Sequence, residues 1–171
     1  MKNQVAKIIQ AMIRYNEADP RRIQHALKVY AFAKNIGELE GLTENQLEVI
    51  EIASVLHDIG IKNSEAKYGS SSGKYQELEG PPVARGILLQ VGIAEEVIQR
   101  VCFLIGHHHT YHEICGDDYQ ILVEADFLVN IGEDNMTPQQ AQEVLQKVFK
   151  TKTAKEYLSK MYLQSEQTNQ E

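Results

Sequence analysis

The sequence has only two cysteines among its 171 residues, Cys102 and Cys115, and they lack the CxxC spacing of redox and zinc sites. Such a pair could form at most one disulfide bridge. Cys102 lies in an apolar helical pattern, where a free thiol packs well. We therefore expect two reduced thiols, as in a cytosolic protein, with a single bridge as the alternative.

Long apolar runs are also missing. No stretch approaches the ~20 residues that are needed to cross a bilayer. The first residues, Met1 to Lys7, lead into an amphipathic pattern rather than the apolar core of a signal peptide. We therefore expect a cytoplasmic protein that has no membrane partner.

Positive charge is scarce. The chain has 17 Lys and Arg residues against 24 Asp and Glu residues, a formal net charge of -7, and its most conspicuous basic cluster is the pair Arg21 and Arg22. Binding to a nucleic-acid backbone needs a basic face, so we expect no nucleic-acid partner. A single nucleotide is not excluded, because one metal ion and a few basic side chains can neutralise a phosphate.

Apolar residues recur at intervals of three and four along most of the chain, which is typical of amphipathic helices. A length of 171 residues, 43% of them hydrophobic, suffices for one core of ordinary size, and no internal repeat is visible. We predict one all-α domain over residues 1–163, an irregular bundle of six or seven helices, and a disordered polar tail over 164–171. The expected helices lie before Asp19, over 21–37, from Thr43 to Gly60, from Pro81 onward, over 93–109, over 121–129, and from Thr137 past Phe149.

Two segments allow more than one interpretation. Residues 121–129 could form a strand by composition, but no second convincing strand is available for pairing, so we predict a buried helix. Residues 62–81 are polar and rich in Gly and Ser and are predicted to be the longest loop. Their stretch from Gly69 to Lys74 looks like a phosphate-binding loop, yet it is one residue short and follows no strand. We favour a flexible lid over the site.

Ionisable residues on apolar helix faces must be paired, neutral or ligated. His25 shares an apolar stripe, and Asp126 lies inside an almost uninterrupted apolar run. His57 and Asp58 are adjacent, so on a helix they point about 100° apart and can both reach a ligand only at the helix end. One metal ion would account for all four residues. The alternatives are a hydrogen-bonded core His25, a solvated Asp58, and a salt bridge from Asp126 to Arg22.

Four short patterns follow one another in a fixed order: Arg22-x-x-His25, Leu56-His57-Asp58-Ile59-Gly60, Ile105-x-x-His108-His109 and Glu124-Ala125-Asp126. This ordered set resembles the HD superfamily of metal-dependent phosphohydrolases over residues 21–130. The resemblance implies an all-helical fold in which one divalent ion is bound by His25, His57, Asp58 and Asp126. It also implies hydrolysis of a phosphomonoester, phosphodiester or phosphoanhydride, in a nucleotide or a related small phosphorylated metabolite.

Members of that superfamily with two metals have further histidines. Their His-His pair matches His108 and His109, which flank the buried stripe of Ile105, whereas His107 falls on the opposite side. Their other histidine is missing here, and Glu79 is the nearest equivalent. Nitrogen and oxygen ligands suit Mn, Fe, Co, Ni or Zn, and a carboxylate also suits Mg. The resemblance therefore implies one or two divalent ions.

The resemblance also implies roles in catalysis. Asp58 would bind metal and orient the attacking water, while Arg22 and Lys62 would bind the phosphate. Superfamily members often have Lys directly after the Gly, but Lys62 lies two residues after Gly60, so an exposed loop lysine is an equal alternative. Two other functions stay open: a non-catalytic, metal-stabilised regulatory module, and a di-iron oxygenase that uses His108, His109 and Glu79. The oligomeric state is open, although the helix over 137–163 could offer an apolar face to a partner.

Overall fold

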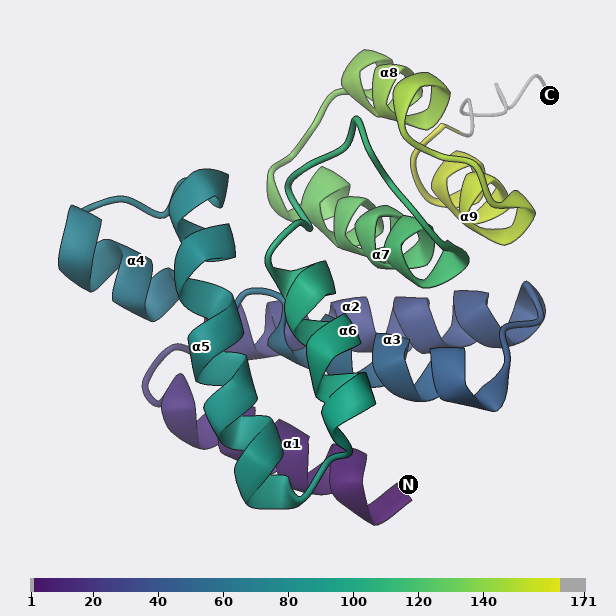
Figure 1. Cartoon of the computed structure of the whole chain (residues 1–171). Helices are drawn as coiled ribbons and strands as arrows, with labels where there is room; N and C mark the ends of the chain where they lie inside the picture. Colours follow the sequence, from purple (N-terminus) through teal and green to yellow (C-terminus); the bar gives the residue numbers. More distant parts are fainter. Residues whose placement is uncertain (1, 164–171) are drawn as a thin grey trace, which may run out of the picture.

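A computed structural model describes residues 2–163, and every regular element in this range is a helix (Figure 1). The predicted all-α class is confirmed. The described helices outnumber the predicted six or seven, and they are α1 (Lys2–Tyr15), α2 (Pro20–Leu39), α3 (Glu44–Leu56), α4 (Ile61–Tyr68), α5 (Gly73–Val91), α6 (Glu95–Ile105), α7 (Asp117–Glu133), α8 (Pro138–Lys147) and α9 (Lys152–Tyr162). The predicted disordered tail at 164–171 lies outside the described residues.

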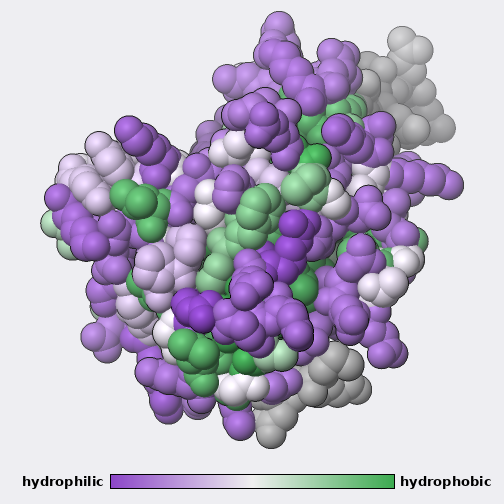
Figure 2. Space-filling model, viewed as in Figure 1, coloured by the Kyte–Doolittle hydropathy of each residue, from purple (hydrophilic) through white to green (hydrophobic). Residues whose placement is uncertain are grey.

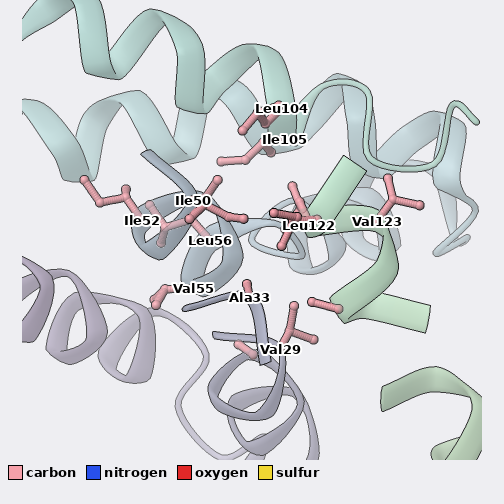
Figure 3. Close-up of a cluster of buried hydrophobic side chains, with 14 of the residues drawn as sticks. Val29, Ala33, Ile50, Ile52, Val55, Leu56, Leu104, Ile105, Leu122 and Val123 are labelled. Carbon is pink, nitrogen blue, oxygen red and sulfur yellow. The ribbon is translucent and has the colours of Figure 1, made fainter. Parts of the chain in front are cut away.

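The core lies between α2, α3, α6 and α7. Helix α2 packs against both α3 and α7, and α3 also packs against α6 and α7. Figure 3 shows fully buried side chains from these four helices meeting one another, such as Val29, Ile50, Ile105 and Leu122. Twelve of the 17 residues of α7 are buried. A helix that is apolar on nearly all sides is a core helix, so the prediction of a buried helix over 121–129 is confirmed.

Local capping signals define several helix starts. The predicted capping box of Thr43 and Gln46 is present at the start of α3. Asp19 caps α2 through the backbone N–H of Arg22, and Pro20 follows in the first turn. Helix α2 continues to Leu39, two residues past the stop predicted at Gly37.

The predicted loop over 62–81 is wrong. Only residues 69–72 connect α4 to α5, and Pro81 and Pro82 lie inside α5 rather than at its start. Contacts between the two helices stabilise this hairpin: Lys67 Nζ and the Tyr68 hydroxyl both donate to the carboxylate of Glu79, at 2.6 and 3.1 Å. These contacts join residues 11 and 12 apart in sequence, so local composition does not report them.

The prediction of one last helix running from Thr137 past Phe149 is also wrong, because the chain breaks at 148–151 into α8 and α9. The buried carboxylate of Glu124 on α7 accepts hydrogen bonds from the backbone N–H groups of Lys150 and Thr151. The Thr151 side chain then caps α9. A carboxylate that takes these two N–H groups holds the chain in a non-helical turn.

The molecular surface of one face is mostly hydrophilic, and its hydrophobic residues lie in separate patches (Figure 2). Scattered exposed hydrophobic residues are normal for globular proteins. Among residues 2–163, no helix combines the length and the apolar character of a membrane span. Cys102 is half-buried, Cys115 is exposed, and both are free thiols, as predicted.

A close backbone contact joins the turn after α3 to α5. A Cβ atom on Gly60 would lie 2.6 Å from both the Gln76 carbonyl oxygen and the Gly80 nitrogen. Backbone atoms cannot rotate away as a side chain can. We therefore expect Gly60→Ala to lower the free energy of unfolding by at least about 2 kcal/mol, measured by urea denaturation.

Gly86→Ala is the matched control, because Gly86 lies inside α5 and a Cβ there would meet nothing within 4 Å. Alanine in an open helical position should leave stability unchanged or raise it by up to about 1 kcal/mol. Equal effects of the two substitutions would contradict the role assigned to the Gly60 contact.

Candidate metal centre

Three packed helices bring the predicted ligands together. His25 lies on α2, His57 is the C-cap of α3, and Asp58 follows in the turn that leads to α4. Asp126 lies near the middle of the buried helix α7. Since α2, α3 and α7 pack on one another, residues from distant parts of the sequence meet at one point.

The ligand atoms of His25, His57, Asp58 and Asp126 lie close together. The Nε2 atoms of His25 and His57 are 3.2 Å apart, and they lie 3.1 and 3.4 Å from Asp126 Oδ1. Each also lies 3.5 Å from Asp58 Oδ2. His25, His57 and Asp58 have the spacing of a group that could hold a metal ion.

The histidine rings are held in one orientation. The Nδ1 atoms of His25, His57 and His108 lie 2.9, 2.8 and 2.8 Å from acceptor oxygens of Glu133, Ser54 and Ile105. An acceptor at Nδ1 requires the proton there, which leaves the Nε2 lone pair available to a metal. In all three residues Nε2 is the atom that faces the carboxylate of Asp58.

The arrangement fits a divalent cation. The Nε2 atom of His108 is buried, has no hydrogen-bond partner within residues 2–163, and lies 3.4 Å from Asp58 Oδ1. Nitrogen lone pairs that face carboxylate oxygens repel them unless a proton or a cation lies between. Imidazole and carboxylate ligands suit the divalent ions of the first transition series. The cluster therefore has the chemistry of a metal centre.

A second group of ligands shares Asp58 with the first. Asp58, His108 and His109 also have metal-binding spacing. Asp58 turns Oδ2 toward His25 and His57 and Oδ1 toward His108. The two oxygens of one carboxylate thus face two different groups of histidines.

Gln76, which the sequence analysis missed, lies beside this second group. It is buried on α5, and its Oε1 lies 3.0 Å from His109 Nε2. Glu79, the expected equivalent of the missing histidine, is one helical turn further on and pairs with Lys67 instead. If residues 73–91 had been predicted as a helix, Gln76 and Glu79 would have been neighbours on its surface. Both would then have been candidates for a place beside the ligands.

The two residues expected to bind phosphate lie in different places. Arg22 lines a cavity of about 520 Å³ together with His25 and Asp58. Its guanidinium contacts Glu65 at 3.2 Å and Asp19 at 3.4 Å, and no ion pair with Asp126 is present within residues 2–163. Lys62 is not brought to the cluster, because its Nζ donates to the backbone oxygen of Tyr15 at 2.9 Å.

The sequence analysis also missed two residues of α7 that support the ligands. Asn130 Nδ2 donates to Asp126 Oδ1 at 2.9 Å, and Glu133 accepts from the His25 ring. They follow Asp126 by four and seven residues, so they share its helix face. That spacing is the sequence signal that could have found them.

Charge coupling in the metal-free protein is strong. Burial lowers the pKa of His57, but the carboxylates of Asp58 and Asp126 outweigh burial and raise this pKa to about 9. Burial raises the pKa of Asp126, but hydrogen bonds from His25 and His57 hold it well below its usual range. The metal-free cluster therefore holds protons where the metal would bind, and metal binding must displace them.

This raised pKa predicts a pH dependence of stability in the metal-free protein. A histidine whose pKa is about 9 when folded and 6.5 in the unfolded reference binds a proton more tightly in the folded state. Its contribution to the free energy of unfolding is complete below pH 6.5 and is lost as the pH rises toward 9. We expect the melting temperature, measured in a chelator, to fall across this range, and less so in His57→Gln. A melting temperature that rises or stays level from pH 6.5 to 9 would contradict this coupling.

Comparisons with a family model and with solved structures each found a match. The HD domain model matches residues 22–150, which are most of the chain and include His25, His57, Asp58 and Asp126. No curated protein matches. The crystal structure of a predicted HD superfamily hydrolase from an uncultured Thermotogales bacterium is similar with a TM-score of 0.62 and 24% sequence identity, covering 94% of this chain and 83% of that one. That likeness shows a shared fold. The chain therefore belongs to the HD domain family.

Proposed function

We propose that this protein is a metal-dependent hydrolase of a small phosphorylated metabolite, either a nucleotide or a related compound. The observation that carries the proposal is the convergence of three imidazole Nε2 atoms on two carboxylates at the edge of a cavity that also contains Arg22. A site built only to stabilise the fold has no need of a guanidinium beside its ligands.

His25, His57, Asp58 and Asp126 are the residues that would hold the ion, which could be Mn, Fe, Ni, Co, Mg or Zn. When bound, such an ion polarises a phosphoryl oxygen and makes a coordinated water more acidic. Asn130 and Glu133 keep Asp126 and His25 in place through hydrogen bonds of 2.9 Å each.

The protein's own groups supply positioning and charge neutralisation, which dominate catalysis of phosphoryl transfer. Arg22 lines the cavity, and a guanidinium can donate to the non-bridging oxygens of a phosphoryl group. Asp58 can accept a hydrogen bond from the attacking water and orient it in line with the leaving group. His109 and Gln76 lie on the other side of Asp58 and can fix a second polar group of the substrate or a second ion.

The second ligand group keeps a two-metal site and the di-iron oxygenase among the alternatives. The carboxylate expected to complete a second iron site, Glu79, instead pairs with Lys67 at 2.6 Å and accepts from Tyr68. This arrangement favours the hydrolase over the oxygenase. The regulatory module would retain metal binding without turnover.

The test is a screen of the purified protein against nucleotides and generic phosphoesters, with Mn, Mg, Ni and Fe supplied separately. Metal analysis of the protein as isolated accompanies the screen. Release of phosphate or of a nucleotide product with at least one metal supports the hydrolase. Metal-dependent folding with no turnover would support the regulatory module, and iron-dependent oxygen consumption would support the oxygenase.

A further inference from the structure

The cavity beside the metal centre is acidic apart from its two arginines. Besides Asp58, its charged lining consists of four carboxylates and two guanidinium groups, namely Asp19, Glu65, Glu133, Asp134, Arg21 and Arg22. Their formal charges sum to -2, and to -1 when Lys28, which pairs with Glu133 from outside the lining, is included. A divalent ion would be balanced by its own ligands Asp58 and Asp126, so the excess of negative charge in the cavity would persist with metal bound.

Arg22 has little capacity for a second phosphate. Its guanidinium already pairs with Glu65 at 3.2 Å and with Asp19 at 3.4 Å, one carboxylate on each side. These contacts hold it against the cavity, where it can meet one phosphoryl group beside the ligands. The two carboxylates also cancel much of the attraction of the Arg22 charge for more distant phosphates, because paired opposite charges screen each other.

Other basic side chains near the cavity already have partners. Lys62 donates to the Tyr15 backbone, and Lys28 pairs with Glu133 at 3.1 Å. Arg21 is exposed at the rim and is the remaining cation of the lining. The second and third phosphates of a nucleoside triphosphate would therefore share the cavity with the carboxylates of Glu65 and Asp134, and one exposed arginine would be left to balance them.

The rest of the lining suits an uncharged polar group. Ser71, Gln76 and Asn130 offer neutral donors and acceptors, and carboxylates accept hydrogen bonds from hydroxyl groups. A cavity of about 520 Å³ lies in the usual size range of small-molecule sites. It has room for one phosphate and a leaving group of sugar or nucleoside size.

From this balance of charge we propose a substrate class, which rests on the hydrolase function proposed above. The substrate is a phosphomonoester that carries a single phosphate on an uncharged, hydroxyl-bearing leaving group, and the carboxylates of Glu65 and Asp134 discriminate against di- and triphosphates. In the reaction, water adds to phosphorus and releases a proton, and the bond from phosphorus to the ester oxygen breaks with its electron pair on that oxygen. The ester oxygen takes up a proton, so that the products are the free alcohol and inorganic phosphate.

The test compares the 5′-mono-, di- and triphosphates of one nucleoside at a constant free concentration of Mn and at low ionic strength. We expect kcat/KM for the monophosphate to exceed that for the triphosphate by about tenfold or more, since repulsion in a cleft changes association by such factors. Asp134→Asn and Glu65→Gln should each raise the triphosphate-to-monophosphate ratio about threefold or more. The gain should shrink in high salt, where exposed charges are screened.

Glu96→Gln is the matched control. It removes the same charge from an exposed position in the first turn of α6, outside the cavity lining, and should leave the ratio unchanged. A wild-type preference for the triphosphate would overturn the proposal, as would a ratio that neither Asp134→Asn nor Glu65→Gln alters.

Binding separates this proposal from the function on which it rests. Calorimetric titration of the Mn-loaded protein with the same three nucleotides measures charge selectivity without turnover. If no substrate in the screen is hydrolysed, the hydrolase function fails. If the wild type binds the monophosphate more tightly than the triphosphate, and Asp134→Asn makes this difference smaller, the charge selection is still supported. Tighter binding of the triphosphate by the wild type would overturn it.

Discussion

Replacing Asp58 by alanine or asparagine is expected to lower kcat/KM for the best phosphoester substrate at least about 100-fold, because one side chain serves two groups of ligands. Its Oδ2 lies 3.5 Å from the Nε2 atoms of His25 and His57, and its Oδ1 lies 3.4 Å from that of His108. Asparagine keeps the shape but loses the charge that attracts a cation. Steady-state kinetics with Mn present, together with metal analysis of the variant, measures the effect.

Asp117→Asn is the control, because Asp117 is exposed in the first turn of α7 and is not among the residues that line the cavity with Arg22. It should keep full activity and metal content. Undiminished activity in the Asp58 variants would rule out the assignment of Asp58 as ligand and water-orienting residue, even if the protein remained a phosphohydrolase.

The second large effect is stabilisation by metal. If the ion binds the folded protein with a dissociation constant of about 1 µM, 1 mM metal adds about 4 kcal/mol to the free energy of unfolding. In a chain of this size that corresponds to a rise in melting temperature of about 8–16 °C. The rise should be larger at pH 9 than at pH 6.5, because the raised pKa of His57 makes protons compete with the metal at the lower pH.

Two histidine variants test whether the cluster of His25, His57, Asp58 and Asp126 causes the metal-dependent rise in melting temperature. His57→Ala removes a fully buried imidazole from the centre and should abolish most of the metal-dependent rise. His112→Ala removes an exposed histidine and should leave the metal-dependent rise unchanged. An equal rise in both variants would place the metal elsewhere in the protein, and no rise in the wild type would contradict the metal centre.

Features that depend on neighbours in sequence were predictable. The capping box at Thr43 and the burial of α7 follow from short-range patterns, and the structure contains both. The grouping of His25, His57, Asp58 and Asp126 was also accessible. His25 and Asp126 lie in apolar stretches, and one metal ion shared with the adjacent His57 and Asp58 offsets the desolvation of both. The structure brings these four residues to one point.

The hairpin of α4 and α5 was not predictable from the same signals. Its sequence is rich in Gly and Ser, and two consecutive prolines normally mark a helix start. The hairpin instead depends on the contact of Lys67 with Glu79 between the helices, and on the hydrogen bond of 2.7 Å from Gln76 Nε2 to the Ser71 backbone oxygen in the connection. The choice of Glu79 relied on the Gly and the helix start expected directly after it, and the structure instead places Glu79 inside α5, paired with Lys67.

Glu124 has a consequence for where the protein can be cut. It lies two residues before Asp126 on α7, and its buried carboxylate is satisfied by Lys150, Thr151 and Gln120. The family match ends at residue 150, so it includes Gln120 and Lys150 but not Thr151. An expression fragment trimmed to that match would lack Thr151 and leave a charged group of the ligand-bearing helix short of donors. A fragment that retains all the donors to Glu124 therefore extends at least to Thr151.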